Sequence, residues 1–309
     1  MTSRLEPVFG RRTVLCDGAM GTLLMEQGIS AEGCDEANRA HPEAVRRIHE
    51  EYLRAGAQVV ETNTFGGNAF RLSRADLPEG AAEINRAGVR IAREAVRRLG
   101  VQKAAWVAGA VGPLGISSER AGRAFRSEAR AAFAEQIAAL AEGGPGVGVD
   151  LLMIETVTAL DEAEQAVLAA REVAPELPVM VLVTVTEDGD CLDGSSPEAA
   201  ARRIASWDVD GMGCNCGFGP EAVMKAIQRM AAATSLPLAA LPNAGLPLLV
   251  EGRTSYPVAP AEMAEFAARL ARAGVQFIGG CCGTTPQHIR AMRSALGLER
   301  MEEARIGQF

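Results

Sequence analysis

The 309-residue chain is poor in aromatic residues and histidine, and it has no long apolar run and no basic cluster. No stretch of about 18 consecutive apolar residues occurs, which argues against a membrane-spanning helix. The segment Met1–Arg12 lacks the apolar centre of a signal peptide. Lys and Arg residues are scattered along predicted helices at a formal net charge of −8, so no nucleic-acid partner is expected. We therefore expect a cytoplasmic protein.

The core must be built largely from small and aliphatic side chains. Aromatic residues make up 4% of the chain, whereas apolar residues together make up 48%. Such a composition suits helices with small side chains that pack on a parallel sheet. The length is normal for a single α/β barrel of roughly 250 residues with extensions.

Short apolar runs alternate eight times with longer Ala-, Arg- and Glu-rich runs of helical periodicity. The predicted strands are Thr13–Asp17, Gln58–Asn63, Ala104–Gly109, Leu151–Glu155, Val179–Thr184, Gly211–Cys214, Pro237–Leu241 and Gln276–Gly280. The predicted helices are Pro42–Ala55, Ala81–Leu99, Ser127–Glu142, Leu160–Val173, Pro197–Ala205, Pro220–Ala233, Pro260–Ala273 and Pro286–Leu296. Alternation of this kind indicates parallel βαβ units.

Eight such units predict a single (β/α)8 TIM barrel over residues 1–297, with residues 298–309 as a tail or linker stub. A doubly wound open sheet is the alternative. However, no Gly-x-Gly-x-x-Gly loop follows the first predicted strand.

Three of the seven cysteines fall where a barrel carries its chemistry, at the C-terminal ends of strands. Cys216 follows the sixth predicted strand, and Cys281 and Cys282 follow the eighth. Adjacent cysteines on a regular strand point to opposite faces, so they can share a metal ion only where the backbone turns. The glycines that flank the pair allow such a turn. Three thiolates with one open position predict a catalytic zinc site, and buried inert cysteines are the alternative.

The other cysteines are interpreted as packing or surface residues. This applies to Cys16, Cys34 and Cys191. Cys214 shares strand parity with Cys216, so we expect it in the core, one layer deeper inside the barrel.

Carboxylates and amides also follow the predicted strands. Glu155 ends an apolar strand, where burial is costly without a partner, so it would bind either a cationic substrate group or a local Arg. Glu61 has the same setting on the second strand. The loop Asp17–Thr22 either presents free N–H groups to a carboxylate or forms a plain tight turn. Asn63 and Asn243 are either hydrogen-bonding or turn residues.

The three histidines show no spacing typical of metal ligands. His41 and His49 lie in the first predicted helical region, and His288 lies in the first turn of the last predicted helix. We expect all three to have structural roles.

Taken together, these motifs resemble the homocysteine S-methyltransferase family from about Val14 to Arg290. The most specific element is Gly279-Gly280-Cys281-Cys282-Gly283, combined with Asn215-Cys216 upstream. The stretch Glu61-Thr62-Asn63-Thr64-Phe65 looks more like the methionine synthase module, or its fusions with methylenetetrahydrofolate reductase, than like the betaine enzymes.

The resemblance implies that Cys216, Cys281 and Cys282 bind Zn2+, and that Asp17, Gly18, Ala19 and Glu155 hold the amino-acid end of homocysteine. Asn63 and Asn243 are the further candidates for substrate binding. A thiol is mostly protonated at neutral pH, and zinc binds its thiolate. The homocysteine thiolate would then attack a methyl group and give methionine.

The methyl donor is less well defined. No Asp-x-His-x-x-Gly motif for cobalamin occurs, so cobalamin would have to come from another domain or chain. The two Trp and two Tyr residues make an aromatic cage for betaine a poor fit. We favour a methionine-synthase-type module that uses methylcobalamin or methyltetrahydrofolate. A standalone enzyme that uses S-methylmethionine or S-adenosylmethionine is the alternative.

A different class of function also fits one part of the sequence. The segment Gly280–Thr285 precedes a predicted helix, as in phosphate-binding barrels that act as lyases or isomerases. That interpretation, like a non-catalytic binding barrel, leaves the cysteines unexplained.

Overall fold

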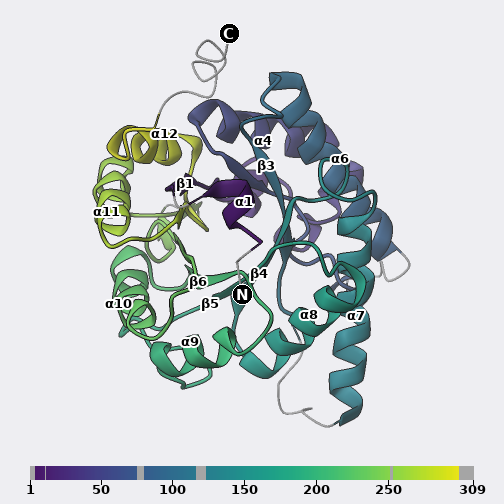
Figure 1. Ribbon diagram of the computed structural model, residues 1–309. Coiled ribbons are helices and arrows are strands. Elements are labelled where there is room, and N and C mark those ends of the chain that lie inside the picture. Colours follow the sequence, from purple (N-terminus) through teal and green to yellow (C-terminus); the bar gives the residue numbers. More distant parts are fainter. Residues whose placement is uncertain (1–3, 11, 75–79, 116–122, 251–252, 299–309) are drawn as a thin grey trace.

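The computed structural model describes residues 4–10, 12–74, 80–115, 123–250 and 253–298. Its main sheet has eight parallel strands in the order β1-β10-β7-β6-β5-β4-β3-β2. A parallel bridge between Cys16 and Val59 links the two ends of this order and closes the sheet. Helices surround the closed sheet on the outside (Figure 1). The predicted (β/α)8 barrel is therefore confirmed.

The barrel strands are β1 (Val14–Leu15), β2 (Val59–Glu61), β3 (Trp106–Val111), β4 (Leu151–Val157), β5 (Val179–Val183), β6 (Gly211–Cys216), β7 (Leu238–Pro242) and β10 (Phe277–Ile278). The longer helices are α4 (Pro42–Ala55), α6 (Ala81–Leu99), α7 (Arg123–Ala141), α8 (Leu160–Val173), α9 (Pro197–Ala205), α10 (Pro220–Ala231), α11 (Pro260–Arg272) and α12 (Pro286–Ala295). Within the described part of the chain, no helix combines the length and the apolar character that crossing a bilayer requires.

Several short elements were not predicted. They are α1 (Glu6–Phe9), α2 (Gly21–Glu26), η1 (Ala31–Gly33), α3 (Ala37–Ala40), α5 (Ala69–Arg74) and the antiparallel hairpin of β8 (Leu248–Val250) with β9 (Arg253–Ser255). Elements of three to six residues are too short to show a period in the sequence. The predicted tail 298–309 lies outside the described residues except for Leu298, so the domain boundary stays a prediction.

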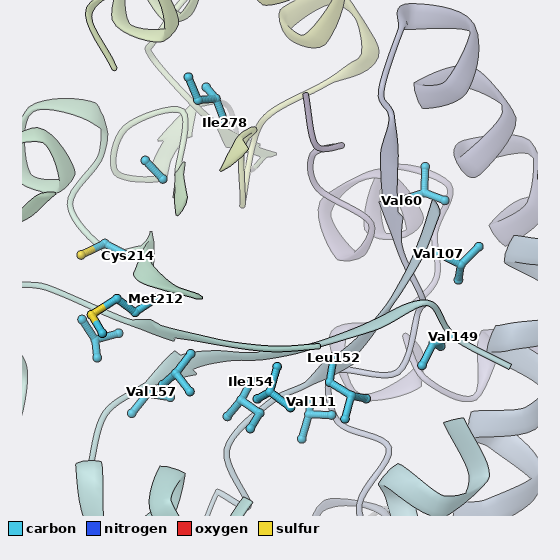
Figure 2. Close-up of a cluster of buried hydrophobic side chains, with 14 of the residues drawn as sticks. Val60, Val107, Val111, Val149, Leu152, Ile154, Val157, Met212, Cys214 and Ile278 are labelled. Carbon is cyan, nitrogen blue, oxygen red and sulfur yellow. The ribbon is translucent and has the colours of Figure 1, made fainter. Parts of the chain in front are cut away.

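Alternating side chains of the strands form two layers of the core. On β4, Leu151 and Met153 point into the barrel, and Leu152 and Ile154 point toward the helices. Figure 2 shows the outer layer, in which strand residues such as Val60 and Val107 face the surrounding helices. This alternation follows from the two-residue period of a strand.

Cys214 belongs to the outer layer, so the prediction of its place inside the barrel was wrong. It packs beside Met212 in Figure 2, and its Sγ lies 3.5 Å from Sδ of Met230 on α10. The parity argument failed because the backbone leaves the regular strand conformation at Cys216. Cys214 is nevertheless a fully buried core residue, as expected.

The short helix α1 covers the N-terminal end of the barrel, over the barrel's centre in Figure 1. Its Leu5 and Phe9 join the inner layer. The Phe9 ring lies 4.7 Å from that of Trp106 and 5.1 Å from that of Phe277, distances typical of favourable aromatic pairs. This end of the barrel is therefore closed by apolar packing, and the opposite end is left for chemistry.

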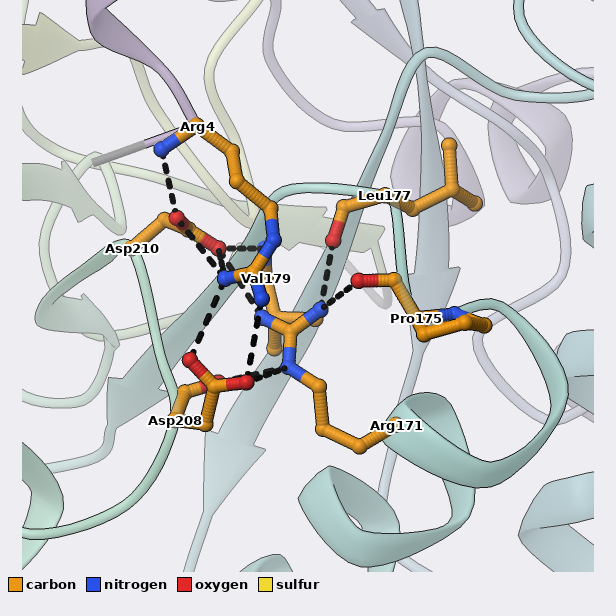
Figure 3. A network of polar contacts seen from close by, with 7 residues as sticks. All are labelled: Arg4, Arg171, Pro175, Leu177, Val179, Asp208 and Asp210. Atoms are coloured by element: carbon orange, nitrogen blue, oxygen red, sulfur yellow. Dashed lines mark hydrogen bonds and ion pairs between the residues drawn. The ribbon is translucent and has the colours of Figure 1, made fainter. Parts of the chain in front are cut away.

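A buried carboxylate joins three segments near the same end of the barrel (Figure 3). Asp210, which is 1% exposed, accepts hydrogen bonds from the backbone N–H of Arg4 (2.7 Å) and of Val179 (3.0 Å). It also pairs with the Arg171 guanidinium at 2.9 Å. The neighbouring Asp208, 45% exposed, pairs with Arg4 at 3.0 Å.

We predict that Asp210→Asn lowers the free energy of unfolding by about 3 kcal/mol, because Arg171, whose side chain is 13% exposed, then keeps only the half-exposed Asp208 as a counter-ion. Asp208→Asn is the matched control, and its cost should stay below about 1 kcal/mol because an exposed ion pair is screened by water. Urea unfolding of both variants measures the difference. Equal losses in the two variants would contradict this account of the network.

Candidate metal and substrate site

The C-terminal ends of β6 and β10 bring three cysteines together. The sulfur atoms of Cys216, Cys281 and Cys282 all lie within 4.8 Å of one another. Strands β6 and β10 both pair with β7, so one strand separates the two ends. The three residues singled out from the sequence therefore form one cluster.

The two adjacent cysteines occupy a turn directly after β10. The Thr284 N–H donates to the Cys281 carbonyl at 3.0 Å, which closes a four-residue turn from Cys281 to Thr284. The turn is fixed to the end of β7, because the Cys281 N–H donates to the Pro242 carbonyl at 2.8 Å. The turn that the sequence analysis required for two neighbouring ligands is therefore present.

Cys216 reaches the cluster through an unusual backbone conformation. Its φ is +60°, in the left-handed region that residues with a side chain rarely adopt, and Gly217 follows at +70°. Such conformations cost on the order of 1–3 kcal/mol and concentrate at functional sites. The conformation turns the Cys216 thiol away from the outward direction of Cys214, although the two residues share strand parity.

The donor set fits a zinc ion. Two sulfurs bound at about 2.3 Å to a tetrahedral ion lie about 3.8 Å apart, which is compatible with three sulfurs that all lie within 4.8 Å of one another. Three thiolates leave the fourth position open, as in catalytic zinc sites, whereas structural sites use four ligands.

The three thiols are strongly coupled. Hydrogen bonds from the thiols of Cys281 and Cys282 lower the pKa of Cys216 to about 3. The same bonds raise the pKa of Cys282 to about 12 and that of Cys281 well above its ordinary value. Without a cation, the cluster therefore holds one thiolate and two thiols near neutral pH, and a metal ion would replace the two protons.

Tyr256 packs over the cysteine turn and was not predicted. A Cβ placed on Gly283 would lie 2.1 Å from the Tyr256 Cγ, and Gly283 has a φ of +77°. Only glycine allows both that conformation and that approach. The pKa of the Tyr256 hydroxyl is raised to about 12 by burial and by the nearby cysteines, so the ring stays neutral.

Three carboxylates line the same cavity as the cysteines. Glu61 ends β2, Glu155 lies near the end of β4, and Asp17 follows β1, with its Oδ2 accepting the Glu61 N–H at 3.0 Å. Burial raises the pKa of Glu61 to about 7. Burial, followed by the charge of Glu61, raises the pKa values of Asp17 and Glu155 well above their ordinary range.

A side-chain hydrogen bond links Glu61 and Glu155, so the two carboxyls share a proton more readily than they ionise together. None of the ion pairs found within the described ranges gives Glu155 an Arg partner, which was one of the two expectations for it. Three buried carboxylates without a cation favour the other expectation, a cationic group of a ligand.

Asn215 connects the carboxylates to the cysteines, a role that the sequence analysis did not assign. Its Nδ2 donates to Glu155 at 2.7 Å and lies 4.0 Å from the Cys281 Sγ. Its Oδ1 accepts the N–H of Thr156 at 2.7 Å, at a bulge in β4 where Thr156 has a φ of +55°. The sequence did offer a signal for this role, because Asn215 is adjacent to the predicted ligand Cys216 and strand parity points its side chain into the barrel.

The loop after β1 lies against the cysteine turn. The Tyr52 hydroxyl on α4 lies 2.8 Å from the Ala19 carbonyl and 2.7 Å from that of Thr284, so it bridges the two segments. A Cβ on Gly18 would lie 2.8 Å from the Thr284 carbonyl oxygen, which explains the glycine. Asp17, Gly18 and Ala19 all line the same cavity as the cysteines.

The two predicted asparagines occupy different positions. Asn63 lines the cavity, and its Nδ2 donates to the Cys34 carbonyl at 2.6 Å. Asn243 lies behind the cysteines, where its Nδ2 donates to the Gly217 carbonyl at 2.8 Å and supports the backbone next to Cys216.

A cavity of ≈ 670 Å³ connects these groups. The cysteines and Tyr256 form one wall, and the carboxylates of Asp17, Glu61 and Glu155 form another. Its volume lies within the range of pockets that enclose drug-sized ligands and leaves room beyond one small amino acid.

His49 and His288 are both buried. His288 Nδ1 accepts the N–H of Thr285 at 3.1 Å and thereby caps the N-terminus of α12. The helix end that a phosphate-binding barrel would use is thus satisfied by the chain's own side chains. His49 is fully buried, and burial lowers its pKa to about 4, so it is neutral.

We predict that Glu61→Gln stabilises the ligand-free protein at about pH 8 by on the order of 1–3 kcal/mol, with little gain near pH 4.5. Glu61 has a pKa of about 7 when folded and 4.5 as an ordinary glutamate. Its contribution is therefore lost as the pH rises through about 7, and glutamine avoids that loss. Urea unfolding at both pH values measures the gain. Substitution of an exposed glutamate, Glu51→Gln, serves as the control. A gain in stability from Glu61→Gln that does not depend on pH would contradict the raised pKa of Glu61.

Comparison with known proteins identifies the family. Residues 14–296 match the model described as homocysteine S-methyltransferase. The methionine synthase of Mycobacterium tuberculosis is 33% identical over 97% of this chain and 26% of its own length, and that of Mycobacterium leprae is 34% identical over 93% and 24%. The chain thus spans about a quarter of these curated relatives.

A solved structure covers the whole barrel. The homocysteine methyltransferase MmuM from Escherichia coli, crystallised in a metallated form, is 26% identical over 94% of this chain and 99% of that chain, with a TM-score of 0.77. Together with the family model, which matches nearly the entire barrel, this shows that the chain belongs to the homocysteine S-methyltransferase family.

Proposed function

We propose that the chain is a zinc-dependent homocysteine S-methyltransferase that forms methionine. The observation that carries the proposal is the cluster of Cys216, Cys281 and Cys282, which faces three carboxylates across one cavity. In the reaction, the homocysteine sulfur attacks the methyl carbon, a C–S bond forms, and the bond between that carbon and the donor breaks. The thiol proton passes to solvent.

The three cysteines would hold the zinc ion. Bound zinc would supply a Lewis acid that keeps a thiol in its thiolate form at neutral pH. The chain's own contribution is the fixed geometry of the sulfurs, through the left-handed Cys216 and the turn after β10. The metallated form of the relative from Escherichia coli supports a metal in this family.

The carboxylates would hold the ammonium group of homocysteine. Asp17, Glu61 and Glu155 are buried together, and an ammonium supplies the positive charge that lets them ionise. The loop at Gly18 and Ala19 lines the same wall and is proposed to contact the amino-acid end as well, with Asn63 beside it. Asn243 would act indirectly, through the backbone next to Cys216.

For the methyl donor, we propose a methionine-synthase-type module supplied with methyl groups by methylcobalamin or methyltetrahydrofolate, with cobalamin carried by another domain or chain. The two mycobacterial methionine synthases support this proposal. The alternative is a standalone enzyme that uses S-methylmethionine or S-adenosylmethionine, which the nearly full-length coverage of MmuM supports. Assays with homocysteine and each donor in turn distinguish the two.

We predict that the purified protein binds about one zinc ion and that Cys281→Ala removes both the zinc and methyl transfer to homocysteine. The matched control is Cys214→Ala, because Cys214 lies two residues from Cys216 but points toward α10. That control should keep its zinc and its activity. Metal analysis and methionine formation are the measurements. Full zinc content and activity in Cys281→Ala would overturn the proposed function.

A further inference from the structure

The cavity has a second charged region, formed by Arg71 and Asp35, that the proposed function does not use. Arg71 is the sole cationic side chain that lines the cavity within the described ranges. Its Nη1 is buried and has no hydrogen-bond partner. Buried donors are nearly always satisfied, so an unpaired guanidinium nitrogen on a residue that lines the cavity indicates a missing acceptor.

The Arg71 guanidinium is held in place before any ligand arrives. Its Cζ lies 5.1 Å from the centroid of the Phe65 ring, a cation–π distance. Phe65 is itself fixed, because its carbonyl accepts the Gly112 N–H at 3.0 Å and a Cβ on Gly112 would lie 2.5 Å from the ring. A fixed guanidinium loses less freedom when it binds an anion.

Asp35 lies next to Arg71, and one of its two carboxylate oxygens already accepts a hydrogen bond from the backbone. Its Oδ1 accepts the Gly66 N–H at 2.9 Å. Burial raises the pKa of Asp35 to about 6, and the Arg71 charge offsets this only in part. Arg71 and Asp35 thus offer an anion site and a cation site side by side, as an α-amino acid requires.

Arg71 and Asp35 are distinct from the three carboxylates, although all five residues line the same cavity. The Arg71 charge lowers the pKa values of Asp35 and Glu162. The pKa of Glu61 is instead set by burial and by Glu155. The cavity volume of ≈ 670 Å³ leaves room for a second ligand at Arg71 beside an amino acid whose ammonium group is held at Glu61.

We propose that Arg71 binds an oxyanion of the methyl donor, the second substrate of this site. The proposal rests on the proposed function, in which homocysteine occupies the carboxylate wall. The oxyanion is either the α-carboxylate of a sulfonium amino acid, with Asp35 accepting its ammonium group, or the phosphate of a cobalamin. Charge-assisted hydrogen bonds of this kind are worth on the order of 10- to 100-fold in affinity.

The test is equilibrium binding to the zinc-loaded full chain, with and without homocysteine. The ligands are S-methylmethionine, its carboxylate-free counterpart (3-aminopropyl)dimethylsulfonium, and methylcobalamin. We expect the wild type to prefer S-methylmethionine over the counterpart by at least about tenfold, and Arg71→Gln to abolish that preference. Loss of affinity for methylcobalamin alone would support the site and identify the phosphate as the oxyanion.

Two further variants keep the result interpretable. Arg71→Lys retains the charge and should keep part of the preference, which shows that a loss in Arg71→Gln is not a folding defect. Arg39→Gln removes an exposed cation outside the cavity and should change nothing. Affinities for S-methylmethionine and methylcobalamin that are unchanged in Arg71→Gln, or an equal loss for the carboxylate-free ligand, would overturn the proposal.

The outcome is separable from that of the proposed function. If no donor methylates homocysteine but the preference depends on Arg71, the proposed function fails and the oxyanion site stands. If methyl transfer proceeds but donor binding does not depend on Arg71, the proposed function stands and the oxyanion site fails.

Discussion

Three sulfur atoms held at one point need a positive charge, and much of the C-terminal end of the barrel is arranged around that need. Thiolates within 4.8 Å of one another repel unless a proton or a metal ion lies between them. The chain accepts a left-handed conformation at Cys216 to complete the set. It also uses a glycine at position 283, where any side chain would collide with Tyr256. Strain of this kind persists only where the surrounding structure holds it in place.

The same logic applies to the carboxylates that line the cavity. Asp17, Glu61 and Glu155 are buried without a cation of their own, and their raised pKa values reflect that cost. The wall is therefore complementary to an ammonium group, as the sulfur cluster is complementary to a divalent ion. Asn215 joins the two walls through hydrogen-bond contacts with Glu155 and Cys281, so the position of the carboxylate is tied to that of the cysteine cluster.

Much of the barrel could be predicted from the sequence because its elements are long and periodic. The bounds of α4, α6, α8 and α9 agree residue for residue with the expectation, since proline, glycine or a change of period marks their ends. The cluster of three cysteines could be predicted because glycines near them allow the backbone to turn. Short elements such as α1 and the β8–β9 hairpin carry no such signal. The predicted orientation of Cys214 was wrong. It was inferred from the strand parity that Cys214 shares with Cys216, but the backbone leaves the regular strand conformation at Cys216.

Side-chain roles that depend on distant contacts were the least predictable. Tyr52 and Tyr256 reach the site from α4 and from the segment after β9, and nothing near them in the sequence indicates the cysteine turn. Arg71 was not singled out from the sequence, although it lines the cavity. Such assignments depend on tertiary packing and emerge only when the barrel is closed.

The central claim is that the three cysteines form an open metal site that receives the substrate thiol. Zinc-edge X-ray absorption of the purified protein, with and without homocysteine, tests it most directly. The account predicts three sulfur neighbours of the zinc in the free protein and four after homocysteine is added. A sulfur count that does not change on addition of homocysteine would contradict it.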